Sequence, residues 1–216
     1  MKISIVGAAG QIARKLHPLL IDDSHQVRGL IRKKEQMDEL AKIGVEPILC
    51  DIEYENDIAQ AVGRADVVVF AAGAGPGSGA ERKWTVDRDG AIKLIEAAKK
   101  IGPKRYIMIS AMGLDKPRGS DVFKVYQKAK AEADEALRKS GLPYVILKPG
   151  RLTNEPGNGN IQLQPSLERG EISREDVAAT LFHIIQTSTL YNVTLDLVQG
   201  DQPIKTAVNK AVEFTA

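Results

Sequence analysis

A glycine-rich segment near the start of the chain has the residue types and spacing that bind phosphate. Gly7 to Ala13 reads G-A-A-G-Q-I-A and directly follows the apolar run Ile3 to Val6. In a strand-to-helix turn of this kind, Gly7 permits the tight turn, Gly10 lets the backbone approach a pyrophosphate, and Ala13 keeps helix and strand close. The segment predicts dinucleotide binding, although a plain strand-to-helix turn could carry the same glycines. The cofactor contacts expected here are Gly7, Ala9, Gly10, Gln11 and Ile12.

The end of the second apolar run carries basic residues where NAD-binding proteins usually carry a carboxylate. Gln26 to Ile31 is followed by Arg32 and Lys33, whereas an Asp or Glu here would bind the ribose 2′-hydroxyl. A guanidinium can bind a 2′-phosphate through two hydrogen bonds, so Arg32, helped by Lys33, predicts NADP rather than NAD. A solvated basic start to the next helix is the alternative. Asp51 and Ile52, after the third run, are expected at the adenine edge, and Asp51 could equally cap the following helix.

A tyrosine and a lysine lie four residues apart in a segment with helical spacing. The pattern predicts a helix from about Asp121 to Lys139, and the spacing puts Tyr126 and Lys130 on one face. There the ammonium group could lower the phenol pKa and prepare Tyr126 for proton transfer. The alternative is structural, because Tyr126 also belongs to an apolar stripe that could pack against a sheet. The other members of this stripe are Val122, Ala129, Ala133 and Leu137.

Short apolar runs alternate with helical patterns along the chain, and these elements would position the residues above. The runs predict about seven strands: Ile3 to Val6, Gln26 to Ile31, Pro47 to Cys50, Asp66 to Ala71, Arg105 to Ser110, Tyr144 to Lys148 and Asn192 to Val198. Arg88 to Ile101 is an example of the helical spacing between them. Uninterrupted apolar runs such as Val67 to Phe70 are typical of parallel strands covered on both faces. We therefore predict an α/β fold with a doubly wound parallel sheet of the Rossmann type, in one domain over residues 1–216.

Two irregular segments, Gly73 to Ala80 and Thr153 to Pro165, are expected to flank the binding site. The first could be a lid or merely mobile. The second lies within residues 151–172, which we interpret as a small substrate-side region of the same domain. Trp84 could form the floor of a substrate pocket, or it could simply be buried. Since little of the chain follows Gly150, the pocket is expected to be small or open.

Taken together, these residues resemble the atypical short-chain dehydrogenase/reductase family. The resemblance covers nearly the full length and rests on the glycine turn, Arg32, Ala71-Ala72-Gly73, Ser110, Tyr126-x-x-x-Lys130 and Leu147-Lys148-Pro149-Gly150. The chain looks similar to small NAD(P)-binding proteins of the epimerase/dehydratase type, and to flavin and biliverdin reductases of the same clan.

The resemblance implies roles for residues at the site. Tyr126 would exchange a proton with a substrate oxygen, Ser110 would hydrogen-bond the same oxygen, and Lys130 would also bind the ribose. Asp87 occupies the position where extended members of the family carry an active-site asparagine. The residues that would line the cofactor by this resemblance are Ala71, Ala72, Gly73, Lys130, Pro149, Gly150 and Leu152.

The activity implied by the resemblance is NADP-dependent oxidoreduction of a small carbonyl, quinone or flavin-like substrate. An alternative is an NADP-binding redox sensor that performs no turnover and presents a changed surface to a partner protein. A third reading is a sugar-nucleotide epimerase or dehydratase, although such enzymes usually have a larger C-terminal region.

Composition narrows the other partners. The chain has 30 basic and 28 acidic residues, giving a net charge of +2, and no long run of one sign, so nucleic acid and membranes are not expected as partners. A single cysteine, Cys50, fits a reducing compartment. The first residues already form a strand pattern and no apolar run is long enough to span a membrane, so we expect a cytoplasmic protein. The three histidines are scattered, and no metal site is predicted.

Overall fold

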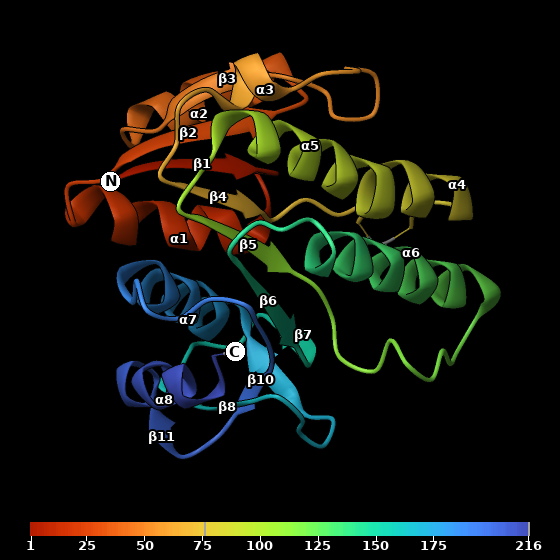
Figure 1. Ribbon diagram of the computed structural model, residues 1–216, viewed down its shortest axis with the longest axis vertical. Helices are drawn as coiled ribbons and strands as arrows, with labels where there is room; N and C mark the ends of the chain where they lie inside the picture. Colours follow the sequence, from red (N-terminus) through yellow and green to blue (C-terminus); the bar gives the residue numbers. More distant parts are fainter. Residues whose placement is uncertain (76, 216) are drawn as a thin grey trace.

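A nine-stranded sheet forms the centre of the protein (Figure 1). The computed structural model describes residues 1–75 and 77–215. The strands of the large sheet lie in the order β11-β8-β10-β6-β5-β4-β1-β2-β3, and a second, small sheet pairs β7 with β9. In chain order the strands are β1 (Lys2–Val6), β2 (Gln26–Ile31), β3 (Glu46–Leu49), β4 (Val67–Phe70), β5 (Arg105–Ile109), β6 (Tyr144–Pro149), β7 (Arg151–Thr153), β8 (Asn160–Gln164), β9 (Glu171–Ser173), β10 (Val193–Gln199) and β11 (Gln202–Pro203).

Seven neighbouring strands of the large sheet, from β3 to β10, are all parallel. This confirms the predicted Rossmann-type α/β fold and all seven predicted strands. The sequence did not indicate the antiparallel edge of this sheet, where β8 runs antiparallel to β10 and β11 antiparallel to β8. Along β8, buried Ile161 and Leu163 alternate with exposed Gln162 and Gln164, and antiparallel strands tolerate such a solvated face.

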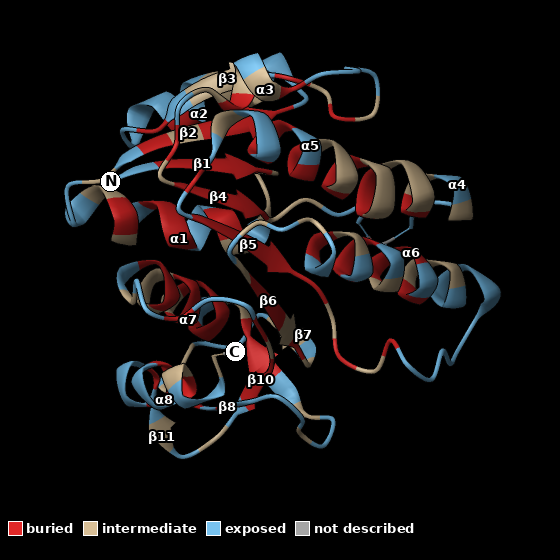
Figure 2. Ribbon diagram, viewed as in Figure 1, coloured by how far each residue is buried: buried red, intermediate tan, exposed pale blue. Residues whose placement is uncertain are grey.

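Alternate residues of the central strands point to opposite faces of the sheet, and both faces are covered. In β4, Val67 and Val69 belong to one apolar cluster, and Val68 and Phe70 belong to the other. This period of two is what a strand dictates, and burial on both sides explains why the run is uninterrupted in sequence. The central strands are accordingly buried along their length (Figure 2).

Helices form a layer on each side of this sheet. The cluster containing Val68 includes side chains of α3, α5 and α6, whereas the cluster containing Val67 includes side chains of α1, α7 and α8. The helical elements are α1 (Gln11–Asp22), the short 3-10 helix η1 (Lys34–Gln36), α2 (Met37–Lys42), α3 (Ala59–Val62), α4 (Ala80–Arg82), the π-helix η2 (Lys83–Gly90), α5 (Ala91–Ile101), α6 (Asp121–Arg138), α7 (Arg174–Gln186), α8 (Ile204–Ala211) and the 3-10 helix η3 (Val212–Phe214).

The two segments expected to be irregular differ in outcome. From Gly73 up to α4, the described residues contain no helix or strand, as predicted; Pro76 lies outside the described part. The expectation for Thr153 to Pro165 is wrong, because this segment contains β8. The expected substrate-side region, residues 151–172, likewise holds β7, β8 and the start of β9. Most of its Asn and Gly residues lie in the irregular stretch between β7 and β8.

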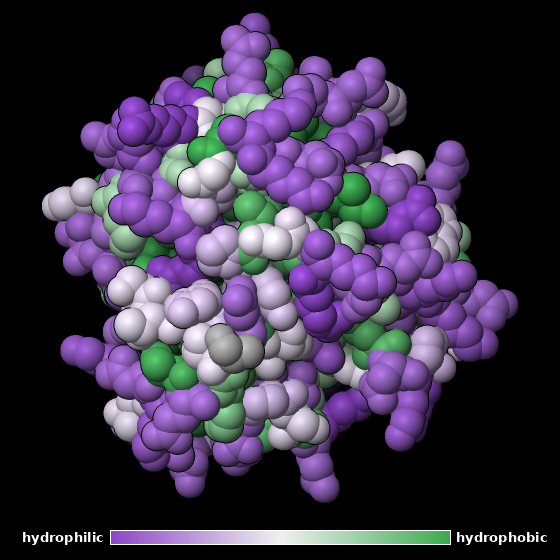
Figure 3. Space-filling view, viewed as in Figure 1, coloured by the Kyte–Doolittle hydropathy of each residue, from purple (hydrophilic) through white to green (hydrophobic). Residues whose placement is uncertain are grey.

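Polar side chains dominate the face of the molecule drawn in Figure 3, and apolar ones gather there only in small groups. Within the residues that the structure describes, no helix combines the length and apolar character needed to cross a bilayer.

Candidate functional site

The turn between β1 and α1 has the geometry of a phosphate cradle. Gly7 has φ +84°, and a Cβ there would lie 2.6 Å from the backbone of Ala72, so only glycine fits. Gly10 begins α1 without a capping side chain, and the first helical turn has no acidic residue. The N–H groups of Gly7, Ala8 and Gly10 already donate to backbone carbonyls of the turn and of β2, so those at the start of α1 are the ones available to an anion. Buried Ala13 packs beneath them, as expected.

A histidine that the sequence did not single out supports this turn from below. His17 is fully buried on α1, and its Nε2 lies 2.8 Å from the carbonyl oxygen of Ala8. Burial lowers the pKa of His17, which keeps the ring neutral, and a neutral ring can donate the Nε2 proton to that carbonyl. The hydrogen bond fixes the middle of the cradle. The sequence feature that could have identified His17 is its spacing of four residues from Ala13, which places both side chains on the same buried face of α1.

The predicted adenosine end of the site contains Arg32 but not Lys33. Arg32 follows β2 directly and lines the cleft, with its side chain exposed and no ion pair to an acidic residue in the described chain. Lys33 is exposed and lies outside the cleft wall, so its expected contact is not supported. Asp51 does not cap a helix: its Oδ1 accepts the backbone N–H of Glu53 at 3.0 Å and closes a turn. Ile52 is buried beside it.

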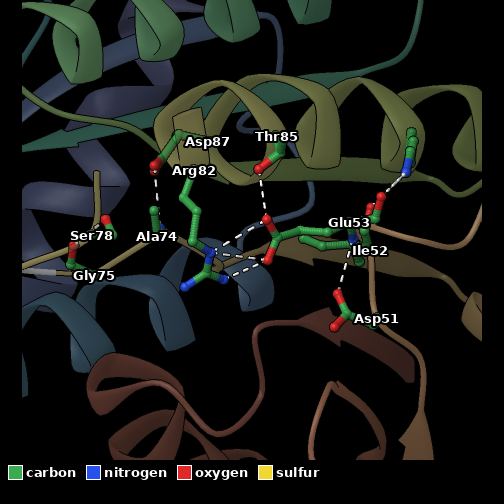
Figure 4. Close-up of polar contacts among 10 residues, drawn as sticks. Asp51, Ile52, Glu53, Ala74, Gly75, Ser78, Arg82, Thr85 and Asp87 are labelled. Atoms are coloured by element: carbon green, nitrogen blue, oxygen red, sulfur yellow. Dashed lines mark hydrogen bonds and ion pairs between the residues drawn. The ribbon is translucent and has the colours of Figure 1, made fainter. Parts of the chain in front are cut away.

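An ion pair that the sequence did not predict connects this end of the cleft to the segment after Gly73 (Figure 4). Arg82 donates through Nη2 to Glu53 Oε2 at 2.5 Å, and Thr85 Oγ1 donates to Glu53 Oε1 at 2.6 Å. The hydrogen bond from Arg82 lowers the pKa of Glu53 most, and the one from Thr85 lowers it further. Lys93 adds a hydrogen bond to the carbonyl of Ile52 at 2.7 Å. The helical segment that begins at α4 is thus attached to the loop after β3.

The middle of the cleft is built where β4 and β6 end. Ala71, Ala72 and Gly73 follow β4 and line the cleft. Asp87 Oδ2 accepts the N–H of Ala74 at 3.2 Å, which fixes the backbone just beyond them (Figure 4). Gly150 packs so tightly that a Cβ would lie 2.3 Å from the carbonyl oxygen of Gly170. Pro149, Arg151 and Leu152 lie beside it in the wall.

Tyr126 and Lys130 both lie on the cleft face of α6, but they are not bonded to each other. Lys130 is buried, and its Nζ donates to the carbonyl of Ile109 at 2.9 Å and lies 3.7 Å from Asp87 Oδ1. Asp87 is 1% exposed. The lysine is therefore a neighbour of this carboxylate, and within the described chain no hydrogen bond joins it to the phenol.

The phenol of Tyr126 is held in its protonated form. Burial, followed by the negative charges of Asp87 and Asp134, raises its pKa. The expectation that Lys130 lowers this pKa is therefore wrong, because desolvation and two carboxylates outweigh one ammonium group. Half-buried Tyr126 stacks on Phe123, with ring centroids 5.7 Å apart and an interplanar angle of 22°. Its ring faces the cleft rather than the core.

Ser110 has a partner that the sequence did not reveal. It follows β5 as predicted, and its Oγ donates to Asp134 Oδ2 at 2.8 Å, with both residues buried. Burial raises the pKa of Asp134 to about 6, against the opposing hydrogen bond from Ser110. The signal in the sequence was the continued four-residue step from Tyr126 to Lys130 to Asp134.

These parts line one continuous cleft of about 1240 Å³. Every predicted site residue except Lys33 lies in its wall: Gly7, Ala9, Gly10, Gln11, Ile12, Arg32, Asp51, Ile52, Ala71, Ala72, Gly73, Asp87, Ser110, Tyr126, Lys130, Pro149, Gly150 and Leu152. Trp84 is not in the wall; it is half-buried, with Arg88 4.6 Å and Lys128 5.7 Å from its ring centroid. Trp84 therefore neither forms the floor of the cleft nor is fully buried.

Comparison with known proteins decides the family. The sequence model of the NAD(P)H-binding family matches residues 7–188, from the phosphate turn to the end of α7. The chain belongs to this family. The match confirms the predicted resemblance. The chain has a NAD(P)-binding, oxidoreductase-like fold of the atypical short-chain dehydrogenase/reductase type.

Three relatives cover nearly the whole of this NAD(P)H-binding protein. An uncharacterized sugar epimerase of Bacillus subtilis, YhfK, is 41% identical over 97% of the chain and 100% of its own length. A candidate NAD-dependent epimerase/dehydratase of Bacillus halodurans has a TM-score of 0.91 and 36% identity, covering 97% of this chain and 99% of its own. The oxidoreductase ylbE of Lactococcus lactis has a TM-score of 0.87 and 30% identity, covering 99% and 97%.

Proposed function

We propose that this protein is an NADP-dependent oxidoreductase that reduces a small carbonyl, quinone or flavin-like substrate. The observation that carries the proposal is the continuity of one cleft, from Arg32 and the phosphate turn to Tyr126, Lys130 and Ser110. A cofactor extended from the turn would reach this second group of residues. The relative that bears the name oxidoreductase supports the same reading.

In the proposed reaction a bound dihydronicotinamide supplies hydride, and the protein supplies a proton and an oriented pocket. The raised pKa of Tyr126 keeps its phenol protonated at neutral pH. In the proposal this phenol protonates the strongly basic alkoxide oxygen that hydride transfer forms on the substrate. Lys130 is held by the carbonyl of Ile109 and lies beside Asp87, which leaves one ammonium proton for a ribose hydroxyl group.

The substrate end of the cleft favours a flat ligand. Tyr126 and Phe123 stack on each other in its wall, and 47% of Phe123 is exposed. Met112 and Val122 extend this apolar surface. An aromatic wall of this kind binds planar compounds through offset or edge contacts, which is the reason for naming quinones and flavins beside simple carbonyls.

The choice of NADP is tested by titrating NADPH and NADH against the protein. Because Arg32 is exposed and has no acidic partner in the described chain, we expect NADPH to bind more tightly. Arg32→Glu should weaken NADPH binding by about 1.5–3 kcal/mol, the scale of a lost charge-assisted contact, and leave NADH nearly unchanged. Lys33→Glu, one residue outside the cleft wall, is the matched control. Equal affinities in the wild type would end the assignment of NADP.

Turnover is tested with NADPH and a panel of quinones, flavins and aldehydes. We expect oxidation of NADPH by the wild type, and Tyr126→Phe should lower kcat by about 10²–10⁴ while NADPH affinity stays the same. Lys130→Ala should reduce both rate and affinity. Activity that survives Tyr126→Phe intact would remove Tyr126 from the mechanism.

A second candidate is an NADP-binding sensor without turnover. It is favoured by one observation, that Lys130 is bonded to the carbonyl of Ile109 and lies beside Asp87 rather than on the phenol. A sensor would bind NADPH tightly, oxidise none with any acceptor, and retain its affinity in Tyr126→Phe. Nucleotide sugars in the same panel test epimerisation, which the name of the Bacillus subtilis relative suggests for that protein.

A further inference from the structure

Asp134 is a buried carboxylate directly behind the cleft. It lies on α6 one turn beyond Lys130 and two turns beyond Tyr126, and its residue is only 1% exposed. Oδ2 accepts the Ser110 hydroxyl at 2.8 Å. Oδ1 is buried and has no hydrogen-bond partner in the described structure. Asp134 does not itself line the cleft, so it reaches a ligand only through Ser110.

The charges around Asp134 are few and mostly distant. On α6, Arg138 Nη2 lies 4.0 Å from Oδ2, and Lys130 is engaged by Ile109 and Asp87. On β6, Lys148 is 3.7 Å from Asp196 of β10 and is shared with it. The groups that face Asp134 are therefore Lys130, Arg138, Lys148 and Ser110, together with Tyr126, whose phenol feels the charges of both Asp134 and Asp87. Desolvation exceeds their combined attraction, and the pKa of Asp134 is raised to about 6.

A carboxylate in this position destabilises the folded protein. Its charge is desolvated, and one of its oxygens is left without a hydrogen bond, which is costly in a buried site. An apolar residue such as Ala133, its buried neighbour on α6, would fill the space without that cost. Groups that reduce stability in this way are typical of functional sites, where the chemistry requires them.

The direction of the hydrogen bond determines what Ser110 can offer to a ligand. A hydroxyl has one proton and two lone pairs. When Asp134 is ionised it can only accept, so the proton of Ser110 points away from the cleft. Ser110 Oγ then presents lone pairs to the cleft and can accept a proton from a hydroxyl group. It cannot donate to a carbonyl oxygen in this state.

We propose that Asp134 is a positioning residue. Its carboxylate accepts the hydrogen bond of the Ser110 hydroxyl, so that Ser110 faces the cleft as an acceptor for the hydroxyl groups of a ligand. When Asp134 takes up a proton from solvent, the carboxylic acid can donate to Ser110 Oγ, and the Ser110 proton is released toward the cleft. Ser110 changes from acceptor to donor with this single protonation. The coupling between the two residues is independent of the proposed function, and only its effect on turnover rests on that function.

The coupling is tested by carboxyl-carbon NMR of the full-length protein, with the Asp134 signal assigned by its loss in Asp134→Asn. We expect this signal to titrate near pH 6. In Ser110→Ala the carboxylate loses its donor, so its midpoint should rise. A midpoint near the ordinary value of Asp, or one that Ser110→Ala leaves unchanged, would overturn the proposal. The Ser110→Ala arm decides the matter even if Asp134→Asn folds poorly.

Stability and turnover provide two more readouts. Because the folded pKa of Asp134 exceeds its unfolded value, the folded protein binds the extra proton between about pH 4 and 6, and its free energy of unfolding falls as pH rises through this window. Asp134→Asn should lack this fall, whereas Glu135→Gln, a substitution of its exposed neighbour, should keep it. If NADPH turnover is found, the limb of its pH profile near pH 6 should vanish in Asp134→Asn alone. If no turnover is found, the proposed function fails, and the NMR titration still decides the role of Asp134.

Discussion

Gly7 illustrates how single residues determine the shape of the cleft. Its positive φ lets the chain leave β1 and turn sharply into α1, and the missing side chain leaves room for the backbone of Ala72. Conformation and close contact are separate demands, and Gly7 meets both. Gly102, at the end of α5, meets only the first, because nothing lies within 4 Å of the place where its Cβ would be.

We expect Gly7→Ala to be much more destabilising than Gly102→Ala. The second substitution carries the cost of a left-handed conformation alone, about 1–2 kcal/mol, whereas the first adds overpacking and should total about 2–4 kcal/mol. Urea denaturation of the two variants measures the difference. Equal losses would mean that the backbone near Ala72 moves freely and that the cradle is not rigid.

Cys50 lines the cleft, and its thiol should be unreactive at neutral pH. Burial, and then the nearby carboxylates of Glu55 and Asp51, raises its pKa to about 11, so the reactive thiolate is scarce below that pH. The greater intrinsic nucleophilicity of a high-pKa thiolate offsets only part of this. At pH 8 we expect iodoacetamide to react with the folded protein at least about tenfold more slowly than in urea, where the thiol is exposed. Similar rates would show that the cleft opens readily around Cys50.

The residues of the cleft wall that the sequence picked out are those defined by local spacing. The glycine turn, Arg32, and the pair Tyr126 and Lys130 could be recognised from spacing because each is defined within a few residues. Asp134 was missed because it lies among Glu132 and Glu135 and looks like part of a solvated helix face. Only the packing of α6 against β5 shows that it is buried.

At the scale of elements, the end of α7 depends on a buried guanidinium from another part of the chain. Arg105 of β5 is 4% exposed, and it donates to the carbonyls of Ile184 at 2.9 Å, Ile185 at 2.8 Å and Leu190 at 3.1 Å, as well as to that of Thr187. Carbonyls at a helix end lack intrahelical donors. One side chain therefore satisfies the helix end and the turn after it.

Arg105→Met should lower the free energy of unfolding by about 2–4 kcal/mol, since it leaves several buried carbonyls without a donor. Lys104→Met is the control, because the neighbouring lysine side chain is 80% exposed and should contribute within about 0.5 kcal/mol. Chemical denaturation of both variants measures the contrast. A loss in Arg105→Met no larger than the control would show that water replaces the guanidinium at the helix end.

Three of the four strands that the sequence failed to reveal are very short. The seven predicted strands were recognisable from their apolar runs, but β7 and β9 have three residues each and β11 has two. Such strands carry too few residues to form a pattern, and pairing across the fold defines them. In β8, the alternation of Ile161 and Leu163 with glutamines was a usable signal that the surrounding Asn and Gly residues obscured.

At the scale of the whole molecule, a strand near the C-terminus, β10, occupies an interior position of the large sheet. β10 lies between β6 and β8, and its Leu195 and Leu197 are fully buried. The family match ends at residue 188, before this strand. The region that the family model matches therefore stops short of the whole sheet, and without β10 the strand β6 would have an open edge and an exposed apolar face.

A chain that ends at Leu190 should fail to fold. Loss of β10 removes parallel pairing along β6 and the partner of β8. The full-length chain should show one cooperative transition in urea, and the shortened chain should show none by circular dichroism and elute as an expanded or aggregated species. A compact, cooperatively unfolding fragment would show that the sheet is stable without its last parallel strand.

Because a π-helix lies between α4 and α5, the number of residues in this segment helps to determine where the site residues lie, in addition to their types. Its wider turns accommodate more residues than an α-helix over the same rise, and both Lys83 and Asp87 are buried within it. Deleting one codon upstream of Asp87 would allow an ordinary α-helix to run into α5. Asp87 keeps its position relative to α5 in such a chain, while Lys83 and Arg82 turn by about 100° about the helix axis. A single in-frame deletion would therefore move Arg82 away from Glu53 while both residues keep their types.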